Sequence, residues 1–176
     1  GALEGADLAR KAPLALFYRL CQHNPAPFLV LMAIAGLPGG WLLASSPERF
    51  VSLRGDEVTA EPIKGTCARA PDPKTDYQLK AALAASPKNR AENIMIVDLM
   101  RNDLSKVCLP GTVQVPTLCE VQSFATVHHL VSRVTGQLKP GLGAIAVLEA
   151  TFPPGSVTGA PKLKAMEWIQ QLEGRP

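Results

Sequence analysis

Apolar and polar positions repeat with two periods along the chain, and these periods predict where strands and helices lie. Residues 49–63, RFVSLRGDEVTAEPI, alternate on both sides of Gly55-Asp56, which is typical of a hairpin. The Val- and Thr-rich residues 112–116 and 119–138 also have period two and predict two further strands. Residues 28–36 and 41–46 predict strands around a turn at 37–40, the first of them buried.

Apolar residues at helical spacing occur in blocks between these strands. The predicted helices are residues 13–24, 75–107 with a break near Ser86-Pro87, 143–152 and 162–174. Residues 67–76 and 153–161 are predicted loops. Because the strands form antiparallel runs and the helices come in blocks, we expect one α+β domain with antiparallel sheets flanked by helices, and not a doubly wound sheet.

Composition narrows the class of protein. The 176 residues carry a net charge of +3, and no basic stripe interleaved with aromatic residues appears, which argues against nucleic-acid binding. The apolar run 28–36 is too short to span a bilayer, and the amino terminus lacks a signal-peptide pattern. The four cysteines are scattered without a CxxC pair, so we expect free thiols in a reducing cytoplasm.

Lys64 stands in the segment EPIKGT, directly after the end of the predicted hairpin strand. A lysine is a nucleophile only when it is neutral, and at pH 7 roughly one ordinary lysine in a few thousand is. Burial or a nearby cation makes a lysine usable. Proline before Lys64 fixes the backbone, and Gly65 after it allows a ligand to approach closely. The segment makes Lys64 a candidate nucleophile; an exposed lysine in a turn is the alternative.

Two carboxylates border an apolar stripe on the long predicted helix. Within residues 90–103, RAENIMIVDLMRND, Glu92, Ile96, Leu99 and Asp103 fall on one side of the helix. A carboxylate at the border of a core helix can bind a hard cation such as Mg²⁺. The alternative is a glutamate that interacts with the helix dipole, together with structural pairs of aspartate and arginine.

Three other segments carry candidate groups. His128 and His129 in TVHHLVS face opposite sides of a strand, so at most one of them can face a given site. Glu48, in SSPERF, approaches Lys64 if the hairpin folds back; a surface turn is the alternative. The loop PPGSVTGAPK offers hydroxyls and backbone amides before a helix, which suit an oxyanion such as a carboxylate. An ordinary capped loop is again the alternative, and the spacing is not that of a Walker A motif.

Taken in order, five motifs resemble those of the catalytic domain of the chorismate-utilising enzymes: SPERF, PIKGT, AENIMIVDLMRNDL, HHLVS and GSVTGAPKLKAME. The resemblance runs from about Phe17 to Glu173. It implies the anthranilate synthase component I-like, chorismate-binding fold. Lys64 resembles the branch of the family named aminodeoxychorismate synthase component I, or para-aminobenzoate synthase, because the anthranilate-forming branch has an alanine there.

The resemblance implies a role for each matching residue. Lys64 would attack C2 of chorismate while the C4 hydroxyl leaves; ammonia would then enter at C4 and the lysine depart, giving 4-amino-4-deoxychorismate. Glu48 would be the general acid, and His129 would orient groups or act electrostatically. Glu92 would bind Mg²⁺ near the ring carboxylate of the substrate. The remaining matches, expected to contact the substrate, are Gly65, Thr66, Ser156 and Gly159.

The resemblance also implies partners. Ammonia would come from a glutamine amidotransferase subunit, component II, and the product would serve 4-aminobenzoate and folate synthesis. Because family members extend beyond both ends, we expect residues 1–176 to be a partial chorismate-binding catalytic domain, truncated at both ends and inactive alone. The alternatives are another chorismate enzyme, making anthranilate, isochorismate or salicylate, and a non-catalytic binding module.

Overall fold

The computed structural model describes residues 13–36 and 39–174, and the chain divides after Arg49 into two compact units. The described residues of the first unit form one helix and one antiparallel strand pair: α1 (Pro13–His23), β1 (Phe28–Ala33) and β2 (Trp41–Ser46). Phe28 lies opposite Ser46, and Ala33 lies opposite Trp41. These elements confirm the predicted helix and strands; residues 37–38 of the predicted turn lie outside the described part.

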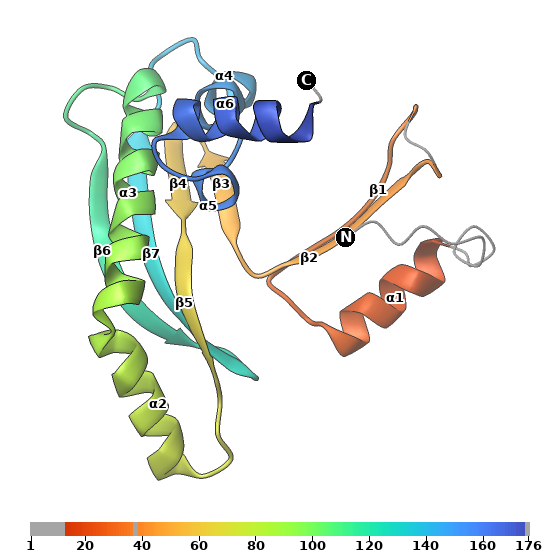
Figure 1. Ribbon diagram of the computed structural model, residues 1–176. Helices are drawn as coiled ribbons and strands as arrows, with labels where there is room; N and C mark the ends of the chain where they lie inside the picture. The colour runs from red at the N-terminus through yellow and green to blue at the C-terminus, as the bar shows by residue number, and fades with distance from the viewer. Residues whose placement is uncertain (1–12, 37–38, 175–176) are drawn as a thin grey trace. The chain divides into compact units, whose positions relative to one another are not determined.

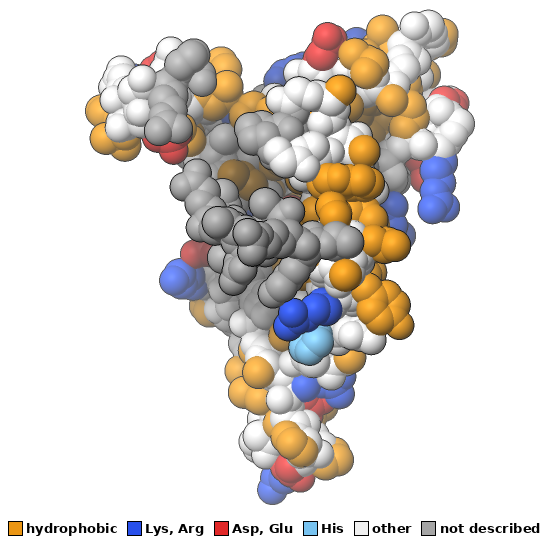
Figure 2. Space-filling view, turned by 90° about the vertical axis from the view of Figure 1, so that its right-hand side faces the viewer, with side chains coloured by type: hydrophobic (Ala, Val, Ile, Leu, Met, Phe, Trp, Pro, Cys, Tyr) orange, Lys and Arg blue, Asp and Glu red, His pale blue; other side chains and the backbone are white. Residues whose placement is uncertain are grey.

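The prediction that the first strand is buried was wrong. No residue of β1 is buried, and Met32 is 50% exposed. Large apolar side chains are exposed elsewhere in the chain as well, and Figure 2 shows hydrophobic side chains grouped on the face that it displays. A two-stranded sheet with a single helix has too few layers to cover both faces of a strand, so an apolar run alone did not ensure burial.

The second unit is built on an antiparallel sheet around one central strand. Its strands are β3 (Arg49–Arg54), β4 (Glu57–Glu61), β5 (Ile63–Ala68), β6 (Gln114–Ser123) and β7 (Val127–Gln137). Strands β4 and β5 pair with successive parts of β7 on one side. Strand β6 also pairs with β7, from Gln114 to Ser123. The predicted hairpin is thereby confirmed. The Val- and Thr-rich residues form two strands, as expected, but the chain turns at residues 124–126 and not at the predicted break between 116 and 119.

The sequence predicted that Lys64 lies just past the end of a strand. In the structure it lies inside the next strand, β5. Pro62 separates β4 from β5, and its carbonyl accepts a hydrogen bond from the Ser132 amide at 3.1 Å. Strand pairing then resumes at Ile63, and the register shifts before Thr66 by one extra residue on β5. The residues at this β-bulge are Lys64 and Gly65. A bulge reverses the alternation of the side chains beyond it, so Thr66 faces the opposite way from Lys64.

Helices cover one face of this sheet (Figure 1). They are α2 (Pro73–Ala85), α3 (Pro87–Val107), α4 (Ala144–Thr151), α5 (Gly155–Thr158) and α6 (Lys162–Glu173). Ser86 separates α2 from α3, and its hydroxyl accepts a hydrogen bond from the Asn89 amide at 3.3 Å. This confirms the break predicted at Ser86-Pro87. The predicted loop 153–161 was partly wrong, because α5 forms one helical turn within it, and the predicted loop 67–76 is shorter, because β5 and α2 enter it.

The core of the second unit lies between the sheet and α3. Val58 and Ala60 of β4 and Val134 of β7 are fully buried and pack in one cluster with Leu104 of α3 and Val147 of α4. Alternate residues of β4 therefore face the helices. All four cysteines are free thiols, as predicted. In the described part of the chain, no helix combines the length and the apolar character needed to cross a membrane.

Candidate active site

Lys64 reaches from the sheet to the loop that follows α4. Its Nζ donates a hydrogen bond to the backbone carbonyl of Ser156 at 3.2 Å, and the side chain is half-buried. Val58, Ala60 and Pro62 are buried before it in the sequence, and the same alternation turns Lys64 toward the helices. The structure thus brings together two motifs that are 92 residues apart. The contact uses the carbonyl of Ser156 and not its hydroxyl.

Gly65, beside the candidate nucleophile, permits a close approach between the strand and the helices. Its φ is +92°, a conformation that disfavours residues with a side chain. A Cβ added there would lie 2.9 Å from the Cβ and Cγ of Asn89 and 3.1 Å from Leu83 Cδ1. Gly65 is therefore required by its neighbours in α2 and α3, independently of any ligand.

Glu92 lies on α3 between two points where glycines approach this helix. Gly65 approaches Asn89, three residues before Glu92, and a Cβ at Gly155 would lie 2.7 Å from Leu99, seven residues after it. Residues separated by three and seven positions share one side of a helix. The helix thus places the Glu92 backbone on the side that receives both the PIKGT strand and the GSVTGAPK loop.

The described residues supply one candidate magnesium ligand and not a complete site. The Glu92 side chain is 44% exposed, and its carboxylate lies 3.9 Å from the Lys88 amine, a distant surface pair. Within residues 13–36 and 39–174, no group of three or more His, Cys, Asp or Glu side chains is placed to hold a metal ion. Mg²⁺ often uses only one or two protein carboxylates, so Glu92 as a magnesium ligand stays a prediction.

His129 faces away from α2 and α3 and contacts Thr66. The Thr66 hydroxyl and His129 Nδ1 are 2.7 Å apart on directly paired strands, and the ring of Phe124 packs edge-on at 5.4 Å between centroids. His129 is 9% exposed, and burial lowers its pKa from 6.5, which favours the neutral imidazole. The structure brings His129 to Thr66 and not to Lys64, whose side chain is on the helical side.

His128 faces the helices, opposite to His129, and the two histidines thus face opposite sides of the strand as predicted. Its Nδ1 lies 2.9 Å from the Ser123 hydroxyl, and its Nε2 lies 3.1 Å from the Asp76 carboxylate in α2. Hydrogen bonds from Arg69, and then from the Ala70 amide, hold the pKa of Asp76 well below its ordinary value of 3.8. His128 therefore belongs to a polar contact that fastens α2 to the sheet.

The expectation of free backbone donors at Gly159 was wrong for the amide of that residue. This amide donates to the Gly155 carbonyl at 2.9 Å and closes the turn of α5. The Thr158 hydroxyl likewise donates to the Pro154 carbonyl at 3.1 Å. The loop satisfies these groups internally because it forms a helical turn, which the sequence pattern did not reveal.

Glu48 lies between β2 and β3, in the first unit of the chain. Its side chain is half-buried, and its amide lies 3.3 Å from the Ser46 hydroxyl. Lys64 belongs to the second unit, and the structure defines each unit by itself. The predicted pairing of Glu48 with Lys64 therefore stays a prediction.

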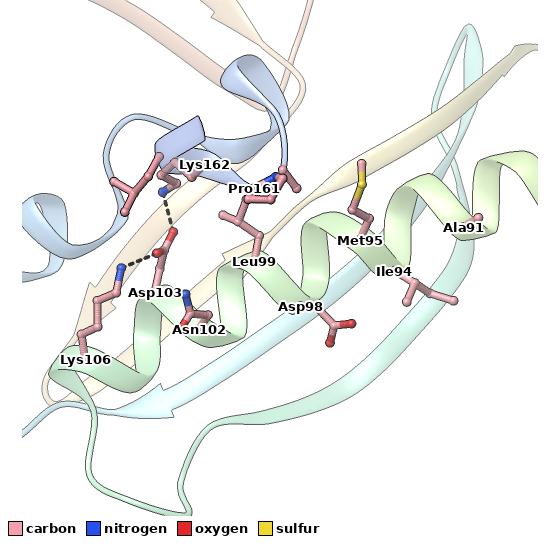
Figure 3. A pocket seen from close by; sticks show the side chains of 12 residues that line it. Ala91, Ile94, Met95, Asp98, Leu99, Asn102, Asp103, Lys106, Pro161 and Lys162 are labelled. Carbon is pink, nitrogen blue, oxygen red and sulfur yellow. Dashed lines mark hydrogen bonds and ion pairs between the residues drawn. The ribbon is translucent and has the colours of Figure 1, made fainter. Parts of the chain in front are cut away.

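Sequence reasoning missed two buried polar contacts of α3. Asp103, predicted as a carboxylate at the end of an apolar stripe, is 2% exposed and accepts hydrogen bonds from the Lys106 and Lys162 amines at 2.7 and 2.5 Å (Figure 3). Asn93, fully buried, donates to the Leu130 carbonyl at 3.1 Å and accepts from the Ser132 hydroxyl. The sequence did carry a signal for the Asn93 contact, because this asparagine lies among the apolar positions of α3 that face the sheet.

An open groove of about 1040 Å³ lies between α3 and the start of α6. Its lining is mainly apolar and includes Met95, Leu99 and Pro161, with Asp103 and Lys162 at one end (Figure 3). Lys64 does not line it. The groove therefore gives no support to a role for Lys64, whose observed contact is with Ser156.

Residues 6–176 match the sequence model of a protein family described as chorismate binding enzyme. The chain belongs to the chorismate binding enzyme family. This confirms the resemblance that the five motifs carried, and the α+β arrangement with antiparallel sheets and helices confirms the expected fold class.

Relatives within the chorismate binding enzyme family carry more than one name. Aminodeoxychorismate synthase component 1 of Salmonella typhimurium is 51% identical over 89% of this chain, and anthranilate synthase component 1 of Saccharolobus solfataricus is 44% identical over 92%. The crystal structure of anthranilate synthase component I from Streptococcus pneumoniae superposes with a TM-score of 0.79 and 35% identity, over 93% of this chain and 35% of that one. The chain spans 34% and 38% of the lengths of the two curated relatives.

Proposed function

We propose that this chain contributes the nucleophilic part of an aminodeoxychorismate synthase component I, which converts chorismate and ammonia to 4-amino-4-deoxychorismate. The observation that carries the proposal is the hydrogen bond between the Lys64 amine and the Ser156 carbonyl. It joins the motif with the distinguishing lysine to the loop expected to contact the substrate. The 51% identity to a relative of that name supports this choice of activity.

The hydrogen bond that Lys64 makes leaves room for an attacking amine. A neutral amine has two N–H groups and one lone pair, so donation of one N–H to the Ser156 carbonyl leaves the lone pair free. In the proposed reaction Nζ forms a bond to C2 of chorismate, the two ring double bonds each shift by one position toward C4, and the C4–O bond breaks. Glu48 gives its proton to the departing hydroxyl, which leaves as water. Ammonia then bonds to C4, and the ring double bonds shift back. The C2–Nζ bond breaks, and Nζ keeps the electron pair of that bond.

Other residues position the substrate in this proposal. Gly65 and Thr66 border Lys64 on β5, and neutral His129 acts through its contact with the Thr66 hydroxyl. The loop residues Ser156 and Gly159 bound the same space from the helical side. Of these groups, Lys64 and the Ser156 carbonyl meet on the helical side of β5, whereas Thr66 and His129 lie on the opposite side of the strand.

Magnesium is part of the proposal with Glu92 as one ligand. A cation bound there would offset the negative charge of a substrate carboxylate. Since the described residues supply no further cluster of ligands, the other positions would be filled by the substrate, water or groups outside this chain. We therefore propose that the 176 residues alone turn over little or no chorismate. A glutamine amidotransferase partner would deliver ammonia to the complete enzyme.

The proposal is tested by placing this chain in the context of a full-length relative. The matching third of the Salmonella typhimurium protein is replaced by this chain, and the chimera is supplied with chorismate, Mg²⁺ and ammonium. We expect 4-amino-4-deoxychorismate as the product, identified by chromatography and mass spectrometry. Lys64→Ala should lower its rate by about 100-fold or more, which corresponds to ~2.7 kcal/mol of barrier.

The matched control is Lys80→Ala, which removes an exposed lysine of α2. It should leave the rate unchanged. Anthranilate or isochorismate as the main product would contradict the proposal in favour of another chorismate enzyme. A Lys64→Ala chimera as fast as the parent would show that ammonia attacks directly, without the lysine.

A further inference from the structure

The loop that meets Lys64 is held at both of its ends by one lysine whose side chain is largely covered. Residues 152–161 join α4 to α6 and contain Ser156. Lys162 follows the loop, and its Nζ donates to the carbonyl of Thr151, the residue before the loop, at 2.6 Å. The same amine donates to Asp103 Oδ2 in α3. One side chain therefore closes the loop and fastens it to the helix that bears Glu92.

The carboxylate at the centre of this arrangement is buried, and both of its oxygens are paired. Lys162 is 12% exposed, and Asp103 and Thr151 are 2% and 0% exposed. The second oxygen of Asp103 accepts a hydrogen bond from Lys106, whose side chain is 53% exposed. Two charges in such surroundings are tolerated only when their geometry is good and their remaining hydrogen-bonding groups are satisfied, and loss of one partner leaves an uncompensated buried charge.

The contact differs from the other lysine pair of the same helix. Lys164 pairs with Glu167 within α6, and both side chains are more than half exposed, so that pair links nothing beyond the helix. Lys162 instead joins the start of α6 to the end of α4 and to Asp103 of α3, which is 59 residues away in the sequence. A second contact, Gly155 against Leu99, presses the loop on α3 near its middle. The loop thus has a fixed course from Thr151 to Lys162.

We propose that Lys162, paired with Asp103, is a positioning residue that holds loop 152–161 so that the Ser156 carbonyl meets the Lys64 amine. Lys162 acts through the loop and touches no reacting atom. The consequence for catalysis rests on the proposed function of Lys64. The geometric claim does not, because it concerns only the contact between Ser156 and Lys64.

The test measures the accessibility of the Lys64 amine and the opening of the loop in the 176-residue chain. Lys64 is acetylated with an N-hydroxysuccinimide ester, and its rate is followed by peptide mass spectrometry. Amide hydrogen exchange is followed at residues 157–159, whose amides donate within the loop. In Lys162→Met we expect both rates to rise by about tenfold while β7 amides are unchanged, because the loop opens locally. Lys162→Arg, which keeps the charge, should largely restore both rates.

Two further variants keep the test decisive. Lys164→Met, two residues along the same helix, is the matched control and should change neither rate. The pair Asp103→Asn with Lys162→Met removes both charges, so it avoids an unpaired buried carboxylate and keeps the fold even where the single variant does not. It should still release the loop. Wild-type rates in the double variant, or an equal rise in Lys164→Met, would overturn the proposal. No substrate is used, so an inactive or lysine-independent chimera leaves this result unaffected.

Discussion

Replacement of Gly65 by alanine tests the geometry around the candidate nucleophile. The added Cβ would lie 2.9 Å from the Cβ and Cγ of Asn89, inside the closest approach that real Cβ atoms make. The Asn89 Cβ is fixed to its helix, so the clash moves backbone and not a flexible side-chain end. Overpacking of this kind costs about 1–3 kcal/mol. The positive φ of +92° adds about 1–2 kcal/mol for a residue with a side chain.

Gly65→Ala is therefore expected to lower the free energy of unfolding by about 2–5 kcal/mol. Gly111→Ala is the matched control, because its φ is +79° and no atom lies within 4 Å of the added Cβ. It should cost about 1–2 kcal/mol, so the difference isolates the close approach. Urea unfolding followed by circular dichroism gives both values, and hydrogen exchange of β7 amides assigns the change to the second unit. Equal costs for the two variants would refute the reasoning.

Two other predictions concern buried polar groups. Asn93→Ala leaves the Leu130 carbonyl and the Ser132 hydroxyl without their partner, so it should lower the free energy of unfolding in urea by about 2–4 kcal/mol. Asn102→Ala, on the exposed side of α3, is the control and should lower it by less than about 0.5 kcal/mol. For His129, burial lowers the folded-state pKa below 6.5, so the unfolded chain binds its proton first and stability is lost as pH falls from 6.5 toward that lower pKa. His129→Gln should remove this part of the pH dependence, and an unchanged pH profile of unfolding would contradict it.

Local pattern was sufficient for most of the elements. The period-two residues around Gly55-Asp56 formed the predicted hairpin, and Ser86-Pro87 separated two helices because serine caps and proline begins α3. The bulge at Lys64-Gly65 could not be predicted, because it arises from pairing with β7, more than sixty residues later. The helical turn α5 was missed for a related reason: its glycine packs against Leu99.

The candidate site was predictable in its residues and not in its contacts. The motifs indicated Lys64 and Ser156, yet the partner of the lysine is a backbone carbonyl, which carries no sequence signal. Asp103 was visible as a carboxylate beside an apolar stripe, but its pairing with Lys162 spans 59 residues and depends on how α6 meets α3. Long-range pairings of this kind follow from tertiary packing and not from local spacing.

The most direct test of the account looks for the bond that Lys64 is proposed to form. The chimera is incubated with chorismate and Mg²⁺ without ammonium, quenched in acid, and digested for tandem mass spectrometry. The account predicts that the peptide containing Lys64 gains the mass of chorismate less one water, and that ammonium removes the adduct as 4-amino-4-deoxychorismate appears. An unmodified Lys64 peptide, together with ammonium-dependent product formation that Lys64→Ala leaves undiminished, would contradict it.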